Sequence, residues 1–207
     1  MPARLASTAE LREALAGYEP ARRWSVEGRR AAAVCVPIQD RNSGPRIWAI
    51  KRPAGLRHHS REMAFPGGKP EPGDEDLLAT ALRETEEEIG ISRSLLTPLG
   101  ALPAVPTATS RFALSPFLVE VASQAVPTPS PGEVAAIVVI DVADFFAGRI
   151  AYSAIDFGAY RSPIFTFPAG AMYGATAHIL EEVLELYAAL GGLTMREPEL
   201  AMEIPWA

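Results

Sequence analysis

Acidic side chains concentrate in one short stretch of the chain. Eight acids lie between residues 71 and 90, where basic residues are few. If this stretch is a helix, Glu84, Glu87 and Glu88 occupy positions i, i+3 and i+4, and their carboxylates project from one face. Hard divalent cations such as Mg²⁺ and Mn²⁺ prefer carboxylate oxygens as ligands. The pattern is suited to a metal site, but composition alone favours a solvated acidic face, and the ordered motif described below is what reverses that preference.

A metal held beside a glycine-rich loop suits the hydrolysis of a diphosphate. The negative charge of a diphosphate deters an attacking hydroxide, and divalent ions neutralise that charge and lower the pKa of a bound water. Gly67 and Gly68 come shortly before the acidic stretch and let the backbone approach a substrate closely. We expect Glu87 and Glu88 to be metal ligands. Glu84 is expected to be a ligand or the general base, and the sequence does not separate these roles.

Basic side chains accompany the acids. Arg83 stands four residues before Glu87, so on a helix it can orient a carboxylate through a charge-assisted hydrogen bond. Arg52, Arg57 and His59 belong to a basic stretch just upstream, which is suited to binding the phosphates of a substrate, including a 3′-phosphate. The alternative for each of these upstream residues is ordinary solvated surface.

The ordered string from Gly68 to Ile91 resembles the Nudix box. That pattern runs Gly, five residues, Glu, seven residues, Arg-Glu, an aliphatic residue, any residue, Glu-Glu, any residue, Gly and an aliphatic residue. Its second half matches Arg83, Glu84, Glu87, Glu88, Gly90 and Ile91. Thr85 replaces the first aliphatic residue. In the first half Asp74 stands where Glu is usual, and one residue is inserted before the Arg.

Within the superfamily, the sequence is similar to the coenzyme A diphosphatase branch. In that branch two arginines and a histidine precede a Phe-Pro-Gly-Gly ending, and Arg52, Arg57 and His59 stand in that order before residues 65–68. The resemblance implies a Mg²⁺- or Mn²⁺-dependent hydrolase that cleaves coenzyme A or acyl-CoA to 3′,5′-ADP and 4′-phosphopantetheine. It also matches Glu133 to a position where many members carry a further acid, as ligand or base.

Three alternatives to this function stay open. Pro106 lies near a position where ADP-ribose hydrolases of the superfamily often carry proline, so ADP-ribose or another nucleoside-diphosphate compound is the nearest rival substrate. A Nudix module that binds a nucleotide without hydrolysing it is the second alternative, although such modules usually lack box carboxylates. The third is a structural domain with a coincidental box.

Composition limits the classes of partner. With 25 acidic and 19 basic residues the formal net charge is −6, which argues against non-specific nucleic-acid binding and against anionic membranes. Cys35 is the only cysteine, which excludes an intramolecular disulfide and fits a reducing compartment. Because no apolar run approaches the length of a membrane span, we expect a soluble, cytoplasmic protein. The resemblance implies a small-molecule nucleotide-diphosphate substrate. The sequence leaves open whether the protein is a homodimer.

Hydrophobic periodicity and turn signals predict the elements that position these residues. Helices are expected at residues 8–17, 76–89, 141–147 and 175–190, the first ending at Gly17. Strands are expected at residues 31–38, 47–52, 99–102, 112–121 and 134–140, the last opened by Glu133.

This order of elements predicts an α/β (α+β) fold, a Nudix-type α/β/α sandwich in which a mixed β-sheet lies between helices. With 207 residues the chain suits one main domain. We place this hydrolase domain at residues 30–192, after a helical extension at 1–29 and before a tail at 193–207.

Overall fold

The computed structural model describes residues 4–20, 22–54 and 62–201. It has the mixed α/β architecture that the sequence predicts, with two sheets in place of one. The larger sheet runs in the order β3-β2-β1-β7-β5, with β4, β6 and β8 paired to β1, β7 and β2. Its strands are β1 (Arg30–Gln39), β2 (Arg46–Lys51), β3 (Met63–Ala64), β4 (Gly67–Gly68), β5 (Leu96–Ala101), β6 (Val105–Pro106), β7 (Phe112–Val121) and β8 (Ala136–Asp141).

β1 is the central strand of the larger sheet. It pairs in parallel with β7 from Arg30 opposite Phe112 to Ile38 opposite Glu120, and it pairs antiparallel with β2 and β4. Side chains from both faces of β1 are buried, which accounts for its nearly unbroken apolar run. The antiparallel pairing of Ile38 with Ile47 joins the two predicted strands 31–38 and 47–52 in a hairpin.

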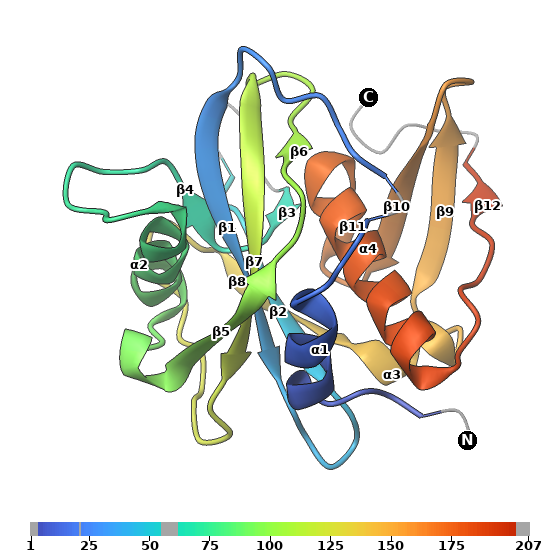
Figure 1. Ribbon diagram of the computed structural model, residues 1–207, viewed down its shortest axis with the longest axis horizontal. Helices are drawn as coiled ribbons and strands as arrows, with labels where there is room; N and C mark the ends of the chain where they lie inside the picture. Colours follow the sequence, from blue (N-terminus) through green and yellow to red (C-terminus); the bar gives the residue numbers. More distant parts are fainter. Residues whose placement is uncertain (1–3, 21, 55–61, 202–207) are drawn as a thin grey trace.

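Helices cover both faces of this sheet (Figure 1). α2 (Leu77–Ile89) packs on one face, against β1 and β7, and leads into the 3₁₀ turn η1 (Arg93–Leu95). α1 (Thr8–Leu15) packs against β5 and α4 (Gly174–Gly191). The short α3 (Val142–Phe146) follows β8 directly.

A second sheet lies beyond α4 and was not expected from the sequence. It consists of β9 (Ala151–Asp156), β10 (Arg161–Phe167), β11 (Gly170–Met172) and β12 (Glu199–Leu200). β10 packs on α4, so that helix lies between the two sheets (Figure 1). β12 comes from the segment predicted as a tail, and its two residues pair in parallel with β9. A strand of two residues is too short for an alternating pattern to be detected in the sequence.

The first helix starts as predicted and ends earlier. Ser7 and Glu10 form a complete capping box, in which the Ser7 side chain accepts from the Glu10 N–H and the Glu10 carboxylate accepts from the Ser7 N–H. The prediction that the helix extends to Gly17 is wrong. α1 ends at Leu15, because the Gly17 N–H bonds the carbonyl of Ala14 and tightens the last turn.

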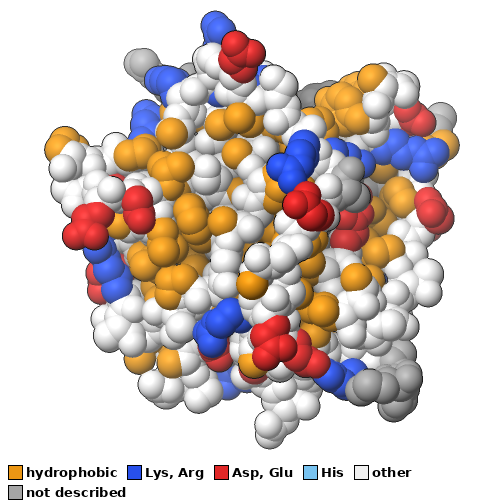
Figure 2. All heavy atoms as spheres, viewed as in Figure 1, with side chains coloured by type: hydrophobic (Ala, Val, Ile, Leu, Met, Phe, Trp, Pro, Cys, Tyr) orange, Lys and Arg blue, Asp and Glu red, His pale blue; other side chains and the backbone are white. Residues whose placement is uncertain are grey.

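The surface of the face in Figure 2 carries acidic and basic side chains next to one another over much of its area. Ion pairs among the described residues include Arg46 with Asp141 and Arg149 with Asp144. Among the residues that the structure describes, no helix is long and apolar enough to cross a membrane.

α1 contributes to the main hydrophobic core, and this yields a stability prediction. Leu11 is fully buried in the cluster that includes α4, whereas Leu190 near the end of α4 is 39% exposed. We expect Leu11→Ala to lower the free energy of unfolding by about 2–5 kcal/mol, because it leaves a cavity, and Leu190→Ala to cost less than about 1 kcal/mol. Urea denaturation of both variants measures the difference. Equal losses would show that α1 does not pack in the core.

Candidate active site

α2 carries the acidic residues, and local sequence signals set its two ends. Asp76 caps the start by accepting from the Ala79 N–H at 2.7 Å. Gly90 ends the helix in the left-handed conformation with φ 66°, a value that favours glycine. The helix therefore begins within one residue of the predicted start and ends at the predicted residue.

The glycine pair of β4 lies directly against α2 and β1. A Cβ on Gly67 would come within 2.3 Å of the Ala33 carbonyl oxygen and 2.7 Å of the Val34 Cα. A Cβ on Gly68 would come within 2.1 Å of Oε1 of Glu84. The missing side chains therefore allow a backbone strand to lie on β1 while carboxylates of α2 reach the loop.

Glu88 is the most buried carboxyl of the α2 cluster, at 6% exposed. Its Oε2 accepts from the Gly67 N–H at 2.9 Å, which fixes the side chain toward the loop. Burial is the main cause that raises the pKa of Glu88 to about 7, and the charges of Glu84 and Glu133 add to it. The Gly67 N–H and the charge of Arg52 act in the opposite direction.

Arg83 is the cation that holds the cluster together. Its Nε and Nη2 donate to the two carboxylate oxygens of Asp74, each at 3.1 Å. Its Nη1 donates to Glu84 at 3.0 Å and to Glu87 at 2.9 Å, and Nη2 also reaches the carbonyl of Lys69 at 3.1 Å. One largely buried guanidinium thus connects the loop before α2 to two carboxylates of the helix.

The three predicted ligands are not equivalent. Glu84 and Glu88 face the glycine loop, whereas the side chain of Glu87 is 52% exposed and reaches Arg83 through the predicted i, i+4 contact. Burial raises the pKa of Glu84 above its ordinary value, while Arg83 opposes that rise. Within the described ranges, no three His, Cys, Asp or Glu side chains lie close enough together to hold one metal ion.

Glu133 approaches the site by a route that the sequence did not show. The segment before it is tied to the end of α2, because the Thr128 N–H bonds the Ile89 carbonyl at 2.8 Å and the Ser130 N–H bonds the Glu88 carbonyl at 2.9 Å. Glu133 lies in the turn that follows and is exposed, so the prediction that it opens a strand is wrong. Its charge nevertheless raises the pKa of Glu88.

One of the predicted basic residues can be placed beside the acids. Arg52 follows β2, its charge acts on Glu88, and its backbone N–H bonds the Glu62 carbonyl. Its Nε is buried and lacks a hydrogen-bond partner among the described residues. Arg57 and His59 lie outside the described residues.

The donor set of this site fits a hard divalent cation. Glu84 and Glu88 supply carboxylate oxygens next to a backbone loop that no side chain obstructs. The pKa of both carboxyls is raised by burial, and a bound cation would favour their charged forms. The buried, unpaired Nε of Arg52 beside them suits an anionic group of a substrate.

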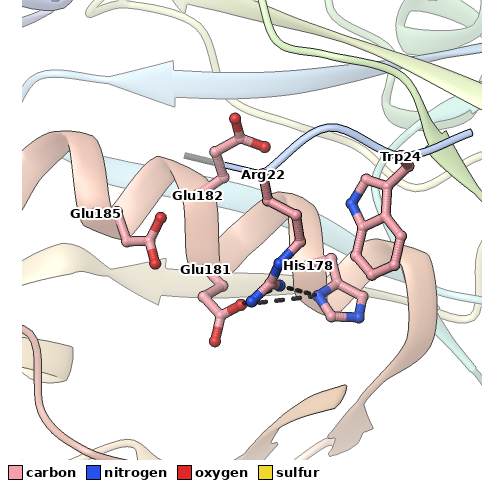
Figure 3. A pocket seen from close by; sticks show the side chains of 6 residues that line it. All are labelled: Arg22, Trp24, His178, Glu181, Glu182 and Glu185. Carbon is pink, nitrogen blue, oxygen red and sulfur yellow. Dashed lines mark hydrogen bonds and ion pairs between the residues drawn. The ribbon is translucent and has the colours of Figure 1, made fainter. Parts of the chain in front are cut away.

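A separate hollow of about 100 Å³ lies along α4 (Figure 3). His178 is buried there against the ring of Trp24, and Arg22 reaches both the Nδ1 of His178 and the carboxylate of Glu181. The remaining lining residues are Glu182 and Glu185. No residue of the acidic box lines this hollow.

Comparison with known proteins bears on this geometry. The NUDIX domain profile matches residues 28–159, which is more than half of the chain. The chain belongs to the Nudix family. Uncharacterized Nudix hydrolases named NudL, from Yersinia pestis strain Pestoides F and from Yersinia pseudotuberculosis strain YPIII, are each 40% identical over 89 residues, 43% of this chain. The chain matches 44% of the length of each of these relatives.

Solved structures of Nudix proteins share the fold. A NUDIX hydrolase from Nitrosomonas europaea aligns with a TM-score of 0.51 and 12% identity, covering 84% of this chain and 80% of that one. A MutT/nudix family protein from Enterococcus faecalis aligns with a TM-score of 0.50 and 13% identity, covering 86% and 73%. At such low identity the likeness concerns the fold alone.

The structure adds two partners of the Nudix box arginine that sequence reasoning missed. Asp74 was noted only as a shortened acid, yet it accepts two hydrogen bonds from Arg83 and one from the hydroxyl of Thr80 at 2.8 Å. The second partner is the Lys69 carbonyl, which accepts a hydrogen bond from Arg83. The acid at the Asp74 position was a signal in the box pattern, whereas a backbone carbonyl leaves no signal in a sequence.

The two adjacent glycines are expected to respond differently to substitution. Gly67→Ala should lower the free energy of unfolding by about 1–3 kcal/mol, because the new methyl group meets backbone atoms. Gly68→Ala should cost less, because the methyl group meets only the flexible end of Glu84, which then moves. Denaturation midpoints and a crystal structure of Gly68→Ala check this. Gly73→Ala, with no atom within 4 Å, is the control.

Asp74 predicts a pH-dependent contribution to stability. The Arg83 guanidinium is the main cause that holds the pKa of Asp74 well below its usual value. A carboxyl with a lowered folded-state pKa stabilises the fold above the unfolded-state value of about 4, and loses this contribution as the pH falls toward the folded-state value. Asp74→Asn should therefore lower the free energy of unfolding at pH 7.

The same variant should approach the wild type in acid. Urea denaturation at neutral pH and between about pH 4 and about pH 2 measures whether the difference between the two proteins shrinks. Exposed Glu75, changed to Gln, serves as the control and should show little difference at any pH. A difference for Asp74→Asn that stays constant with pH would contradict the prediction.

Proposed function

We propose that this protein is a divalent-metal-dependent Nudix hydrolase that cleaves the diphosphate of coenzyme A or acyl-CoA. The products would be 3′,5′-ADP and 4′-phosphopantetheine. The observation that carries the proposal is the pairing of Glu84 and Glu88 with the glycine loop, braced by Arg83.

The positions of the carboxylates support hydrolysis over simple binding. Glu84 is half-buried and Glu88 is buried, and burial raises the pKa of both carboxyls beside a backbone loop that a diphosphate can approach. A carboxylate held in such a position is suited to accept a proton from water, which is the task of a general base. A module that only binds a nucleotide has no need for such groups.

A divalent cation would be held by Glu84 and Glu88, and we propose Glu87 as a further ligand and Glu133 as a ligand or base that would have to move toward them. When bound, Mg²⁺ or Mn²⁺ would neutralise the diphosphate and lower the pKa of a water. Arg83 positions the Glu84 and Glu87 carboxylates, and its bidentate bond to Asp74 keeps the guanidinium in place.

The choice of coenzyme A as the substrate rests on the branch resemblance and on the unpaired Nε of Arg52. Arg52, Arg57 and His59 match the motif of that branch, and the unpaired Nε of Arg52 can bind a phosphate. The 40% identity to NudL covers less than half of either chain and concerns a relative without an assigned substrate. We propose the five residues Arg52, Arg57, His59, Gly67 and Gly68 as the substrate-binding set.

The proposal is tested by offering four diphosphates to the purified protein with Mg²⁺ or Mn²⁺. Coenzyme A, 3′-dephospho-coenzyme A, ADP-ribose and NADH are compared by product analysis. We expect cleavage of coenzyme A with the highest kcat/KM. Preference for ADP-ribose would keep the hydrolase chemistry and overturn the substrate, and metal-dependent turnover of none of the four would contradict the proposal.

Substitutions of three α2 carboxylates, two as tests and one as a control, check the proposed site. Glu87→Gln and Glu88→Gln should each lower kcat/KM by about 100-fold or more, because a charge needed at the diphosphate is lost. Glu86→Gln changes an acid of the same helix that is exposed and paired with Arg93, and should leave activity unchanged. Equal activity of Glu88→Gln and Glu86→Gln would remove Glu88 from the site.

A further inference from the structure

Two basic side chains meet over one aromatic ring at the end of the sheet where β1 and β7 begin. The Cζ of Arg30 lies 4.2 Å from the centre of the Phe112 ring, and the Nζ of Lys69 lies 5.6 Å from it. Both distances suit cation–π contacts. We call these three residues the Phe112 cluster.

The cations of the Phe112 cluster have no acidic partner within the described part of the chain. The Nη2 of Arg30 donates to the Ser110 carbonyl at 3.3 Å. Among the described residues, the side-chain ammonium of Lys69 contacts only the Phe112 ring. Elsewhere in this acidic protein exposed arginines are commonly paired, as Arg12 is with Glu120 and Arg93 with Glu86. Two unpaired cations that share one ring repel each other, and an anion between them would remove that repulsion.

Further basic residues adjoin the cluster. Arg29 and Arg111 are its neighbours in sequence, and the Arg30 N–H bonds the Arg111 carbonyl at 3.1 Å. Several basic side chains gather along the upper left edge of the face in Figure 2, the end at which β1 and β7 begin in Figure 1. An acidic side chain lies among them at the top of this view (Figure 2).

The cluster is joined to the candidate active site through Lys69. This residue directly follows Gly68, whose backbone lies against Glu84. Its carbonyl accepts from Arg83, while its side chain extends to Phe112. On β1, Arg30 is three residues before Ala33, the partner of Gly68. A ligand with its diphosphate at Glu84 and Glu88 can therefore extend toward the cluster.

We propose that Arg30 and Lys69 bind a phosphate monoester of the substrate that is separate from the diphosphate being cleaved. This inference rests on the proposed hydrolase function and deepens it, because it requires a phosphorylated nucleoside as the substrate class. The planar guanidinium of Arg30 keeps free N–H donors for phosphate oxygens, and Lys69 adds a second charge. Both cations lie against the same Phe112 ring.

The first test compares two substrates that differ only in this phosphate. We measure kcat/KM for coenzyme A and for 3′-dephospho-coenzyme A with the wild type, Arg30→Gln and Lys69→Gln. Each variant should lose about tenfold on coenzyme A and little on the dephosphorylated compound, since a charge-assisted hydrogen bond to the phosphate is lost. Arg149→Gln changes an exposed arginine paired with Asp144, and should change neither value.

The second test measures binding without turnover. Isothermal titration of 3′,5′-ADP and 5′-AMP should show tighter binding of the bisphosphate to the wild type, and Arg30→Gln should remove this preference. Circular dichroism and the denaturation midpoint confirm that the variants fold.

The outcomes distinguish this inference from the proposed function. Equal losses on both substrates, or equal binding of 3′,5′-ADP and 5′-AMP by the wild type, would overturn the phosphate site while leaving the hydrolase intact. If the wild type cleaves neither coenzyme A compound, the proposed substrate fails, and the titration alone decides. A preference for 3′,5′-ADP that Arg30→Gln abolishes would then still support the phosphate site.

Discussion

The close contact between α2 and the glycine loop is the constraint on which the site depends. The Glu84 carboxylate lies directly against the backbone of Gly68, in the space that a side chain at Gly68 would occupy. Gly67 fits against the backbone of β1 and donates its N–H to Glu88. A side chain at Gly67 would meet the backbone of β1, and a side chain at Gly68 would displace the Glu84 carboxylate from the loop.

Electrostatics makes this arrangement costly, and Arg83 is what offsets the cost. Burying Glu84 and Glu88 raises the pKa of both, because their charged forms lose hydration. Arg83 offsets part of this lost hydration through its hydrogen bonds to Glu84 and Glu87. Asp74 in turn accepts from Arg83 and holds it in place. The result is a set of carboxylates that is stable enough to fold and still short of positive charge, as a cation-binding site must be.

The basic side chains divide into two groups with different surroundings. Most exposed arginines on the described surface have acidic partners, which keeps an acidic protein free of large single-charge areas. Among the described residues, Arg30 and Lys69 of the Phe112 cluster have no acidic partner, and the Nε of Arg52 makes no hydrogen bond. Positive charge that the fold leaves unpaired next to buried carboxylates matches a substrate with several phosphates.

Much of this site follows from sequence alone, because its signals are local. Helical spacing places Arg83 next to Glu87, Asp76 and Gly90 delimit the helix, and the apolar runs predict the main strands. The box pattern then indicates the chemistry. Local spacing treats Glu84, Glu87 and Glu88 as equivalent, whereas in the structure Glu88 is buried, Glu84 is half-buried and Glu87 is exposed.

Only the tertiary structure decided how distant residues reach the site. Glu133 influences Glu88 because the segment before it bonds to the end of α2, and Lys69 reaches Phe112 because β4 pairs with β1, itself beside β7. The second sheet likewise depends on packing, because its strand β10 lies against α4. Chain-local rules determine helices and turns, whereas contacts across 40 or more residues depend on packing, which no spacing in the sequence records.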